Sequence, residues 1–285
     1  GHARLAVELL TRADESRARE IALYLDEQNR RRQSLERKIA KQAREMVADR
    51  GLAGDARRAI VLASEQWHPG VVGIVAARLV EEFHRPAILI ALENGQGQGS
   101  GRSIRNFHMF EALAACGEHL QAFGGHAMAG GLRIEASRIE PFAEAFVDYA
   151  NRRLTAADLQ PKLHLDAVAL LLELSLETAT QLLGLGPFGL GNPRPRLQVE
   201  AVELAGEPRC VGRNQEHLQF TVRQNGCVVK AIAFGQARRA PMLRDQRRCD
   251  LAFEPLLNTF RGQTSVELRV LDIRPCRAGA ASAAG

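Results

Sequence analysis

The first part of the chain has the pattern of a single long helix. Between residues 13 and 49 there is no Pro or Gly, and apolar residues recur at helical intervals with dense charge between them. The thin apolar stripe and the arginine run at 30–32 are typical of a helix that connects two bodies, and Gly51 and Gly54 end it. The apolar positions are Ile21, Leu25, Leu35, Ile39 and Met46.

Residues 58–153 alternate between strand and helix patterns. Short apolar runs predict buried strands, longer amphipathic runs predict helices, and Ser137 with Glu140 predicts a capping box for the last helix. Turns are expected in the glycine-rich stretch after residue 92 and at Gly124-Gly125. This order indicates an α/β domain with a mixed sheet. The expected strands are 58–63, 86–92 and 132–135, and the expected helices are 70–83, 107–120 and one that ends near residue 153.

The pattern changes after residue 162. A short strand and a helix at 169–183 lead into a Gly- and Pro-rich segment at 184–195 that cannot be regular structure. Short strand patterns then follow one another, separated by turn signals such as Asn225-Gly226 and Arg261-Gly262. Several short strands in a small basic region predict a small all-β barrel, and the OB-fold is the obvious candidate. The expected strands are 197–204, 217–223, 227–234, 249–255 and 265–272.

The composition is that of a globular protein with two domains. The chain has 285 residues, of which 46% are hydrophobic and 25% are charged. No apolar run approaches the ~18 residues of a membrane span, and residues 1–19 carry charges where a signal peptide would be apolar. The five cysteines fit no zinc-binding spacing. We therefore expect free thiols, a cytoplasmic location and no membrane contact.

Charge is distributed unevenly along the chain. The net charge is +5 overall, but residues 193–285 hold 15 basic and 9 acidic side chains, whereas residues 51–192 hold 11 and 15. Arginines outnumber lysines, and guanidinium groups suit bidentate contacts with phosphate. Codon bias in a GC-rich genome would give the same preference. The charge therefore favours a nucleic-acid partner only weakly.

Two glycine-rich segments could carry chemistry. In residues 94–105 (NGQGQGSGRSIR), glycines allow close approach of an anion, Ser100 and Ser103 offer hydroxyls, and Arg102 and Arg105 offer positive charge. The segment is not a Walker loop, and taken alone it favours a hairpin or flexible loop over a phosphate site. A second segment, GGHAMAGG at 124–131, places His126 among glycines, where an imidazole can reach a ligand or can merely be exposed.

Two further features remain open. The Trp67-His68-Pro69-Gly70 sequence at a predicted helix start is consistent with an anion site or with a packed Trp and a helix-opening Pro. A metal site is hard to assemble, because the eight histidines are scattered and no Asp-x-Asp or Asp-His-His occurs. We expect no metal site in this chain.

The order and spacing of these motifs resemble a known family. Residues 67–79 (WHPGVVGIVAARL), Arg85-Pro86, GSGRS at 99–103 and FGGHAMAG at 123–130 resemble the DHH-associated substrate-binding domain of the DHH phosphoesterase superfamily. Two later segments, PFGLGNPRP at 187–195 and NTFRGQTSVEL at 258–268, resemble the linker and OB-fold of the RecJ family of single-strand-specific DNA exonucleases.

The resemblance implies an organisation for the whole chain. A preceding catalytic DHH domain would bind Mn²⁺ or Mg²⁺, and no cofactor is expected in this chain. The implied parts are the tail of the catalytic domain at 1–12, a connecting helix at 13–53, the DHH-associated domain at 54–158, the linker and OB-fold at 159–276, and a flexible tail at 277–285.

The resemblance also implies roles for individual residues. The Gly-Ser-x-Arg-Ser loop would bind DNA phosphate, and the Gly-Gly-His turn would face the metal centre, with His126 in a catalytic position. Phe260 is the aromatic residue expected to be exposed on the OB-fold, beside Arg261. The implied phosphate-binding residues are Ser100, Gly101, Arg102, Ser103, Arg105, Gly124 and Gly125.

The function implied for the intact protein is 5′ to 3′ hydrolysis of single-stranded DNA to mononucleotides in recombination and repair, alongside other repair proteins as possible partners. This chain alone would bind DNA without cutting it. The rival interpretation is a non-catalytic single-strand-binding or adaptor protein, because basic OB-folds bind strands by groove charge and base stacking.

Overall fold

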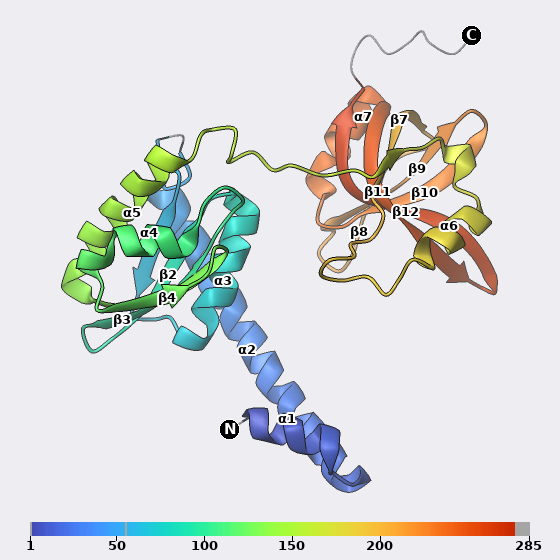
Figure 1. The fold of residues 1–285 in the computed structure, drawn as a ribbon. Helices are drawn as coiled ribbons and strands as arrows, with labels where there is room; N and C mark the ends of the chain where they lie inside the picture. The colour runs from blue at the N-terminus through green and yellow to red at the C-terminus, as the bar shows by residue number, and fades with distance from the viewer. Residues whose placement is uncertain (1, 55, 277–285) are drawn as a thin grey trace. The chain divides into compact units, whose positions relative to one another are not determined.

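The computed structural model describes residues 2–54 and 56–276, so the tail predicted at 277–285 lies outside the described residues. The chain divides into two compact units, residues 1–161 and residues 162–285 (Figure 1). Each unit has its own hydrophobic core, and we describe each by itself.

The predicted long helix is present as α2 (Glu15–Asp49). It begins two residues later than expected because the Asp14 side chain caps it by accepting a hydrogen bond from the Arg17 N–H at 2.8 Å. Near its start, Arg17 forms a 2.8 Å ion pair with Glu8 of the preceding helix α1 (His2–Thr11). Towards its end, Ile39, Ala43 and Val47 are buried against helix α3 (Pro69–Phe83) and the sheet. The second half of α2 is therefore part of the first unit's core.

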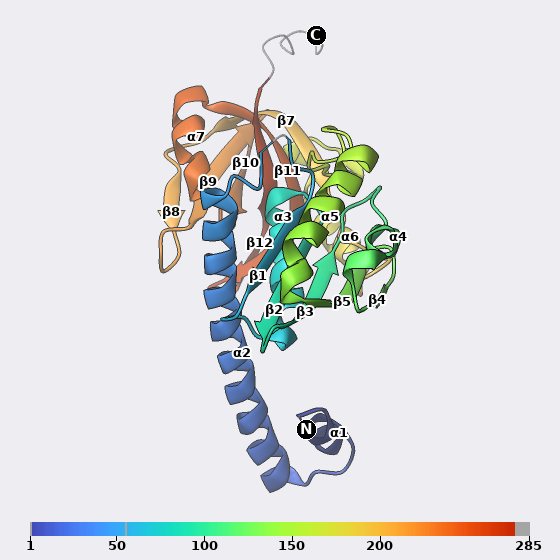
Figure 2. The same cartoon turned by 90° about the vertical axis from the view of Figure 1, so that its left-hand side faces the viewer.

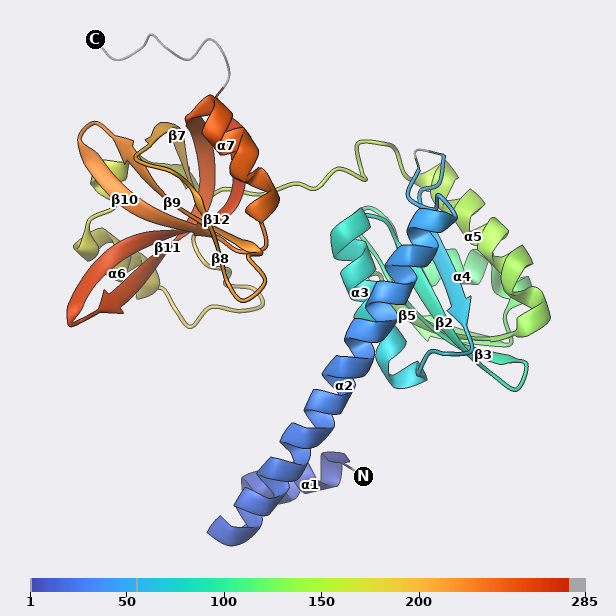
Figure 3. The same ribbon diagram turned by 180° about the vertical axis from the view of Figure 1, so that it is seen from behind.

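A five-stranded mixed sheet forms the centre of the first unit, with strand order β1-β2-β3-β5-β4. Helices α2 and α3 cover one face (Figures 2 and 3), while α4 (Met109–Ala115) and α5 (Ile139–Arg153) pack on the other. The α/β fold with a mixed sheet is as predicted. The strands are β1 (Ile60–Ser64), β2 (Ala87–Glu93), β3 (Gln96–Arg102), β4 (Ala122–Gly125) and β5 (Ala129–Glu135).

The glycine-rich segment after residue 92 is a central strand, and the prediction of a turn there was wrong except at Asn94-Gly95. Glycines in this strand leave room for side chains of its neighbours. A Cβ at Gly97 would lie 2.7 Å from Ile90 Cγ2, and one at Gly101 would lie 2.9 Å from Met109 Sδ. The glycines thus let two layers pack closely over β3.

Three smaller expectations in this unit were also wrong. Gly124-Gly125 ends strand β4 instead of forming a turn. The Ser137 and Glu140 capping box does not form, because a 3₁₀ turn at Ala136–Arg138 runs directly into α5 and Arg138 is already helical. The helix expected at 107–120 is divided into α4 and a 3₁₀ turn at Gly117–His119.

Strands of the second unit pair in the order β6-β7-β11-β12-β10-β9-β8, and β7 also pairs with β9. These pairings close β7, β9, β10, β12 and β11 into a ring, in which β10 and β12 run parallel. The core inside it includes Phe220 and Phe253. The strands are β6 (Ala167–Val168), β7 (Leu197–Leu204), β8 (Arg209–Val211), β9 (His217–Gln224), β10 (Cys227–Ala233), β11 (Arg248–Phe260) and β12 (Gln263–Pro275), and the helices are α6 (Leu176–Leu183) and α7 (Ala240–Gln246).

Packing against β3 predicts at which positions the replacement of glycine destabilises the fold. We expect Gly97→Ala to lower the free energy of unfolding by about 1–3 kcal/mol, because the added methyl overpacks Ile90 and Ile134. Gly124→Ala is the control, because a Cβ there meets nothing within 4 Å and the change should be within ~0.5 kcal/mol. Urea unfolding of both variants measures the difference, and equal losses would contradict this packing.

Burial also predicts which cysteines react. All five thiols are free, and burial raises the pKa of Cys116 to about 11 and that of Cys249 to about 12. At pH 8 the folded chain should therefore be alkylated by iodoacetamide first at the three partly exposed thiols, Cys210, Cys227 and Cys276. Peptide mass spectrometry measures the order, and urea should make all five react. Equal labelling in the folded chain would contradict the burial.

Candidate nucleic-acid interface

Ser100 and Arg102 lie on the face of β3 opposite to its buried glycines. The Arg102 guanidinium Nη1 donates to Ser100 Oγ at 3.0 Å and to the Gly101 carbonyl at 2.8 Å, so both side chains have defined positions. Both residues are partly exposed. A hydroxyl and an oriented guanidinium side by side form a pair suited to a phosphate group.

Glycines continue this face across the sheet. Ser100 pairs with Gly131 of β5, and Gly131 pairs with Gly124 of β4, so the three lie in one row on the same face. A Cβ at Gly124 would meet nothing within 4 Å, and one at Gly131 would meet only the Gly99 carbonyl, at 3.8 Å. The internal packing therefore does not require glycine at either position. The row forms an open floor of backbone beside Ser100, which we call the glycine floor.

Helix α3 approaches this face very closely at Gly73. A Cβ at Gly73 would lie 2.8 Å from Ser100 Oγ and 3.1 Å from Arg102 Nη2. The start of α3 is fixed by His68, whose Nδ1 accepts a hydrogen bond from the Gly70 N–H at 3.0 Å. Trp67 is buried and its indole N–H donates to Gln42 Oε1 at 2.9 Å. The Trp-His-Pro-Gly sequence thus has a capping and packing role that holds α3 against β3.

His126 lies in the turn between β4 and β5, at the end of the sheet where β3 finishes at Arg102. Arg102 pairs with Ala129, and the His126 N–H donates to the Ala129 carbonyl at 2.8 Å. The residue is exposed. Gly125 has φ +148°, and a Cβ there would lie 2.4 Å from the Ala129 carbonyl oxygen, so only glycine fits this turn.

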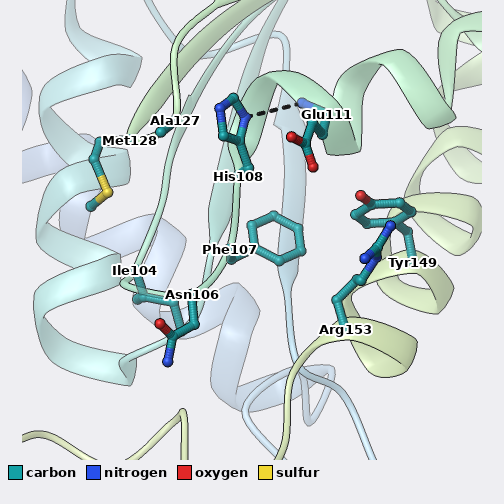
Figure 4. Close-up of a pocket in the computed structure, with 9 residues that line it drawn as sticks. All are labelled: Ile104, Asn106, Phe107, His108, Glu111, Ala127, Met128, Tyr149 and Arg153. Atoms are coloured by element: carbon teal, nitrogen blue, oxygen red, sulfur yellow. Dashed lines mark hydrogen bonds between the residues drawn. The ribbon is translucent and has the colours of Figure 1, made fainter.

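A pocket of about 260 Å³ lies beside the same turn (Figure 4). Ala127 and Met128 line it, and their carbonyls accept hydrogen bonds from the Met109 and Ser103 N–H groups at 2.8 and 2.9 Å. These bonds tie the His126 turn to α4 and to the end of β3. The other lining residues shown are Ile104, Asn106, Phe107, His108, Glu111, Tyr149 and Arg153.

Not all residues predicted for the phosphate loop lie on the open face. Ser103 is 5% exposed, and its hydroxyl donates to the Phe107 carbonyl at 2.6 Å, so it supports the loop before α4. Gly101 faces Met109 in the core. Arg105 is exposed but lies beyond the end of β3. The structure therefore brings Ser100, Arg102 and Gly124 together and removes Ser103 and Gly101 from the open face.

A larger cavity of about 750 Å³ continues along the same sheet face. Its lining includes Gln98 of β3 and Arg133 of β5, which pair with each other. They form the row adjacent to the glycine floor on the same face of the sheet. His68 at the start of α3 also lines it, together with the carboxylates of Glu65 and Glu93. The open face is thus a polar surface of mixed charge that extends beyond Ser100.

On the second unit, Phe260 and Arg261 lie at the tip of the β11–β12 hairpin. Phe260 is 67% exposed, as predicted, and the Arg261 guanidinium lies 5.3 Å from the centre of its ring. Phe234 is also exposed, at 52%. Phe234 directly follows strand β10, in which buried and exposed residues alternate, and this alternation places its side chain on the outside.

Comparisons with known proteins identify both units. A DHHA1 domain model matches residues 56–152, and a RecJ OB domain model matches residues 165–272. The chain belongs to the RecJ family. The resemblance noted in the sequence is confirmed for both units.

Individual RecJ proteins match almost the whole chain. The single-stranded-DNA-specific exonuclease RecJ of Bacillus subtilis is 34% identical over 94% of this chain and 34% of its own length, and that of Haemophilus influenzae is 33% identical over 95% and 48%. The crystal structure of Thermus thermophilus RecJ with Mg²⁺ has a TM-score of 0.76 at 29% identity and covers 95% of this chain and 40% of that one. The chain therefore spans between a third and a half of the length of these RecJ relatives.

Metal ligands are not clustered in the described part of this RecJ chain. Among residues 2–54 and 56–276, no group of three or more His, Cys, Asp or Glu residues could hold a metal ion. Within the same residues, no helix is both long enough and apolar enough to cross a membrane.

Proposed function

We propose that this chain is the substrate-binding part of a RecJ exonuclease that hydrolyses single-stranded DNA from the 5′ end to mononucleotides, in recombination and repair. The observation that carries the proposal is the pairing of Ser100 and Arg102 beside the glycine floor. The names of the relatives support the substrate, because they are single-stranded-DNA-specific exonucleases. The α/β unit would receive the strand end, and the OB domain would hold the strand.

Each residue of the open face has a distinct role in this proposal. Arg102 and Ser100 hold the terminal phosphate through a charge-assisted hydrogen bond and a hydroxyl. Gly124 and the turn at Gly125 allow the phosphate backbone to lie close to the sheet. His126 at the end of the floor would donate a hydrogen bond to the reacting phosphate. Together these groups position a strand end and stabilise negative charge.

The metal ions of the reaction would come from outside this part of the protein. Solved RecJ structures from Thermus thermophilus contain Mg²⁺ or Mn²⁺, and no group of three or more His, Cys, Asp or Glu residues that could hold a metal ion occurs among the described residues of this chain. We infer that Mn²⁺ or Mg²⁺ is bound by a catalytic domain in the part of the relatives that this chain does not match. This chain alone would then bind DNA without turnover.

The end contact predicts a dependence on the 5′ phosphate. We expect Arg102→Ala to weaken binding of a 5′-phosphorylated oligonucleotide by about 1.5–3 kcal/mol and to leave a 5′-hydroxyl strand nearly unchanged, because a charged hydrogen bond is lost. Fluorescence anisotropy at fixed salt measures both affinities. Arg138→Ala is the matched control, because it removes one positive charge from the 3₁₀ turn that follows β5. Equal losses for both strands would reject a dedicated end contact.

Turnover separates the nuclease from the adaptor. With Mn²⁺ and a 5′-phosphorylated strand, the purified chain should bind but release no mononucleotides. A longer protein that also contains the part matching the rest of the RecJ relatives should release them, and Arg102→Ala should lower its kcat/KM. Release by this chain alone would show that catalysis lies within it. No release by the longer protein would favour a single-strand-binding adaptor.

A further inference from the structure

Glu36 of helix α2 is a buried carboxylate that the proposed function does not use. It is 3% exposed, and its two oxygens contact arginines from two different helices. Arg32 Nη1, one turn farther along α2 itself, donates to Glu36 Oε2 at 2.9 Å, and Arg78 Nη2 of α3 pairs with Oε1. A buried charge is tolerated only when it is paired, so Glu36 fixes both guanidinium groups. We call Glu36, Arg32 and Arg78 the carboxylate clamp.

The carboxylate clamp lies where α2 joins the core of the α/β unit. Along α2, Ile21 is buried near the start and the next buried residue is Glu36. The segment between them is stiffened by ion pairs within the helix, such as Glu27 with Arg31 at 2.8 Å. Figure 3 shows this half of α2 extending past the sheet and α3. Glu36 is therefore at the base of a projecting helical arm.

Helix α3 connects the clamp to the candidate site. Arg78 belongs to the same helix as Gly73, where an added Cβ would lie 2.8 Å from Ser100 Oγ. Buried residues of α3 such as Val75 and Leu79 pack in the apolar core. Apolar contacts are non-directional, so they resist separation of α2 and α3 more than a change in the angle between them. A carboxylate with an arginine on each oxygen has a defined geometry and resists that change.

Two further contacts tie α2 to the α3 region, and both lie farther along α2. The Trp67 indole N–H donates to Gln42 Oε1 at 2.9 Å, and Arg44 pairs with Glu82 at 2.6 Å. The Arg44–Glu82 pair is partly exposed on both sides, and exposed ion pairs contribute little to stability. These contacts hold the half of α2 that already lies in the core, whereas the clamp lies at the point where the helix leaves it.

The length of the arm makes the angle at Glu36 important. At about 1.5 Å per residue, Ile21 lies about 22 Å from Glu36, so a tilt of about 5° at Glu36 moves Ile21 by about 2 Å. Misplacement of a reacting group by about 1 Å can lower a rate about 100-fold. A small loss of angular definition at the clamp would therefore be large for any group that the arm carries.

We propose that Glu36 is a positioning residue for the nuclease reaction. It holds α2 at a fixed angle to α3, and so sets the distance between a metal-binding part joined to the start of α2 and the phosphate contact at Ser100 and Arg102. The inference rests on the proposed function, because it requires that catalytic part. Loss of the clamp lowers the rate and leaves binding of the strand end intact, since Ser100 and Arg102 stay in place on β3 when α2 tilts.

An apolar replacement separates positioning from stability. Glu36→Leu combined with Arg78→Leu removes both buried charges together, and replacement of a buried ion pair by apolar residues is neutral or stabilising in many proteins. In the longer protein of the turnover experiment, we expect kcat on a 5′-phosphorylated strand to fall about 10- to 100-fold while KM stays the same. In the chain itself, the double variant should keep its 5′-phosphate preference in binding. Arg44→Leu with Glu82→Leu is the matched control, and its kcat should be unchanged.

Urea unfolding of the same variants makes each outcome decisive. An unchanged kcat in a double variant that unfolds at the normal urea midpoint overturns the inference, as does a rise in KM at constant kcat. An equal fall in kcat for the Arg44 and Glu82 control also overturns it, because the burial of Glu36 would then be irrelevant. If the double variant unfolds early, Glu36→Gln, which keeps the size and one acceptor, is measured by the same criteria.

The unmodified longer protein distinguishes this inference from the proposed function. If it releases mononucleotides and the clamp variants release them equally fast, only the role of Glu36 is wrong. If the unmodified longer protein releases none, the proposed function fails and this inference fails with it.

Discussion

The close contact between helix α3 and strand β3 determines where the candidate site lies. Gly73 leaves no side chain between the helix and the pair Ser100 and Arg102, and the alternate glycines of β3 let Ile90 and Met109 fill the opposite face. Helix α3 on one face and the core side chains on the other therefore both pack directly against the backbone of β3. Since Arg102 also donates to Ser100 and to the backbone, the pair proposed to bind phosphate is held by a packed core and not by a loop.

Under the proposed function, the two units would recognise a single strand through different kinds of contact. The α/β unit offers a short row with one guanidinium, one hydroxyl and bare backbone, which suits the chemistry of a strand end. The OB domain offers exposed aromatic rings at Phe234 and Phe260 with arginines beside them, which suits bases and phosphates along a strand. A contact that recognises the end confers selectivity, whereas contacts along the strand confer affinity.

The sequence predicted the helices and strands better than it predicted which side chains are exposed. Helix α2, both buried strands β1 and β2 and the α/β order follow from hydrophobic spacing, and the motif order was sufficient to identify the family. The sequence motif predicted a phosphate contact for both Ser100 and Ser103, because a motif does not show which way a side chain points. In the structure, strand alternation turns Ser103 inward, where its hydroxyl donates to the Phe107 carbonyl. Gly97 and Gly99 were read as turn residues because a sequence does not show which side chains of neighbouring strands occupy the space above them.

The glycine floor has a consequence for what the protein can distinguish. Gly124 and Gly131 present only peptide groups to whatever lies on them, and such groups make the same contacts with every nucleotide. A strand end bound there would be recognised through its sugar and phosphate, and its base would make no difference. A surface of this kind would therefore accept a strand end of any sequence.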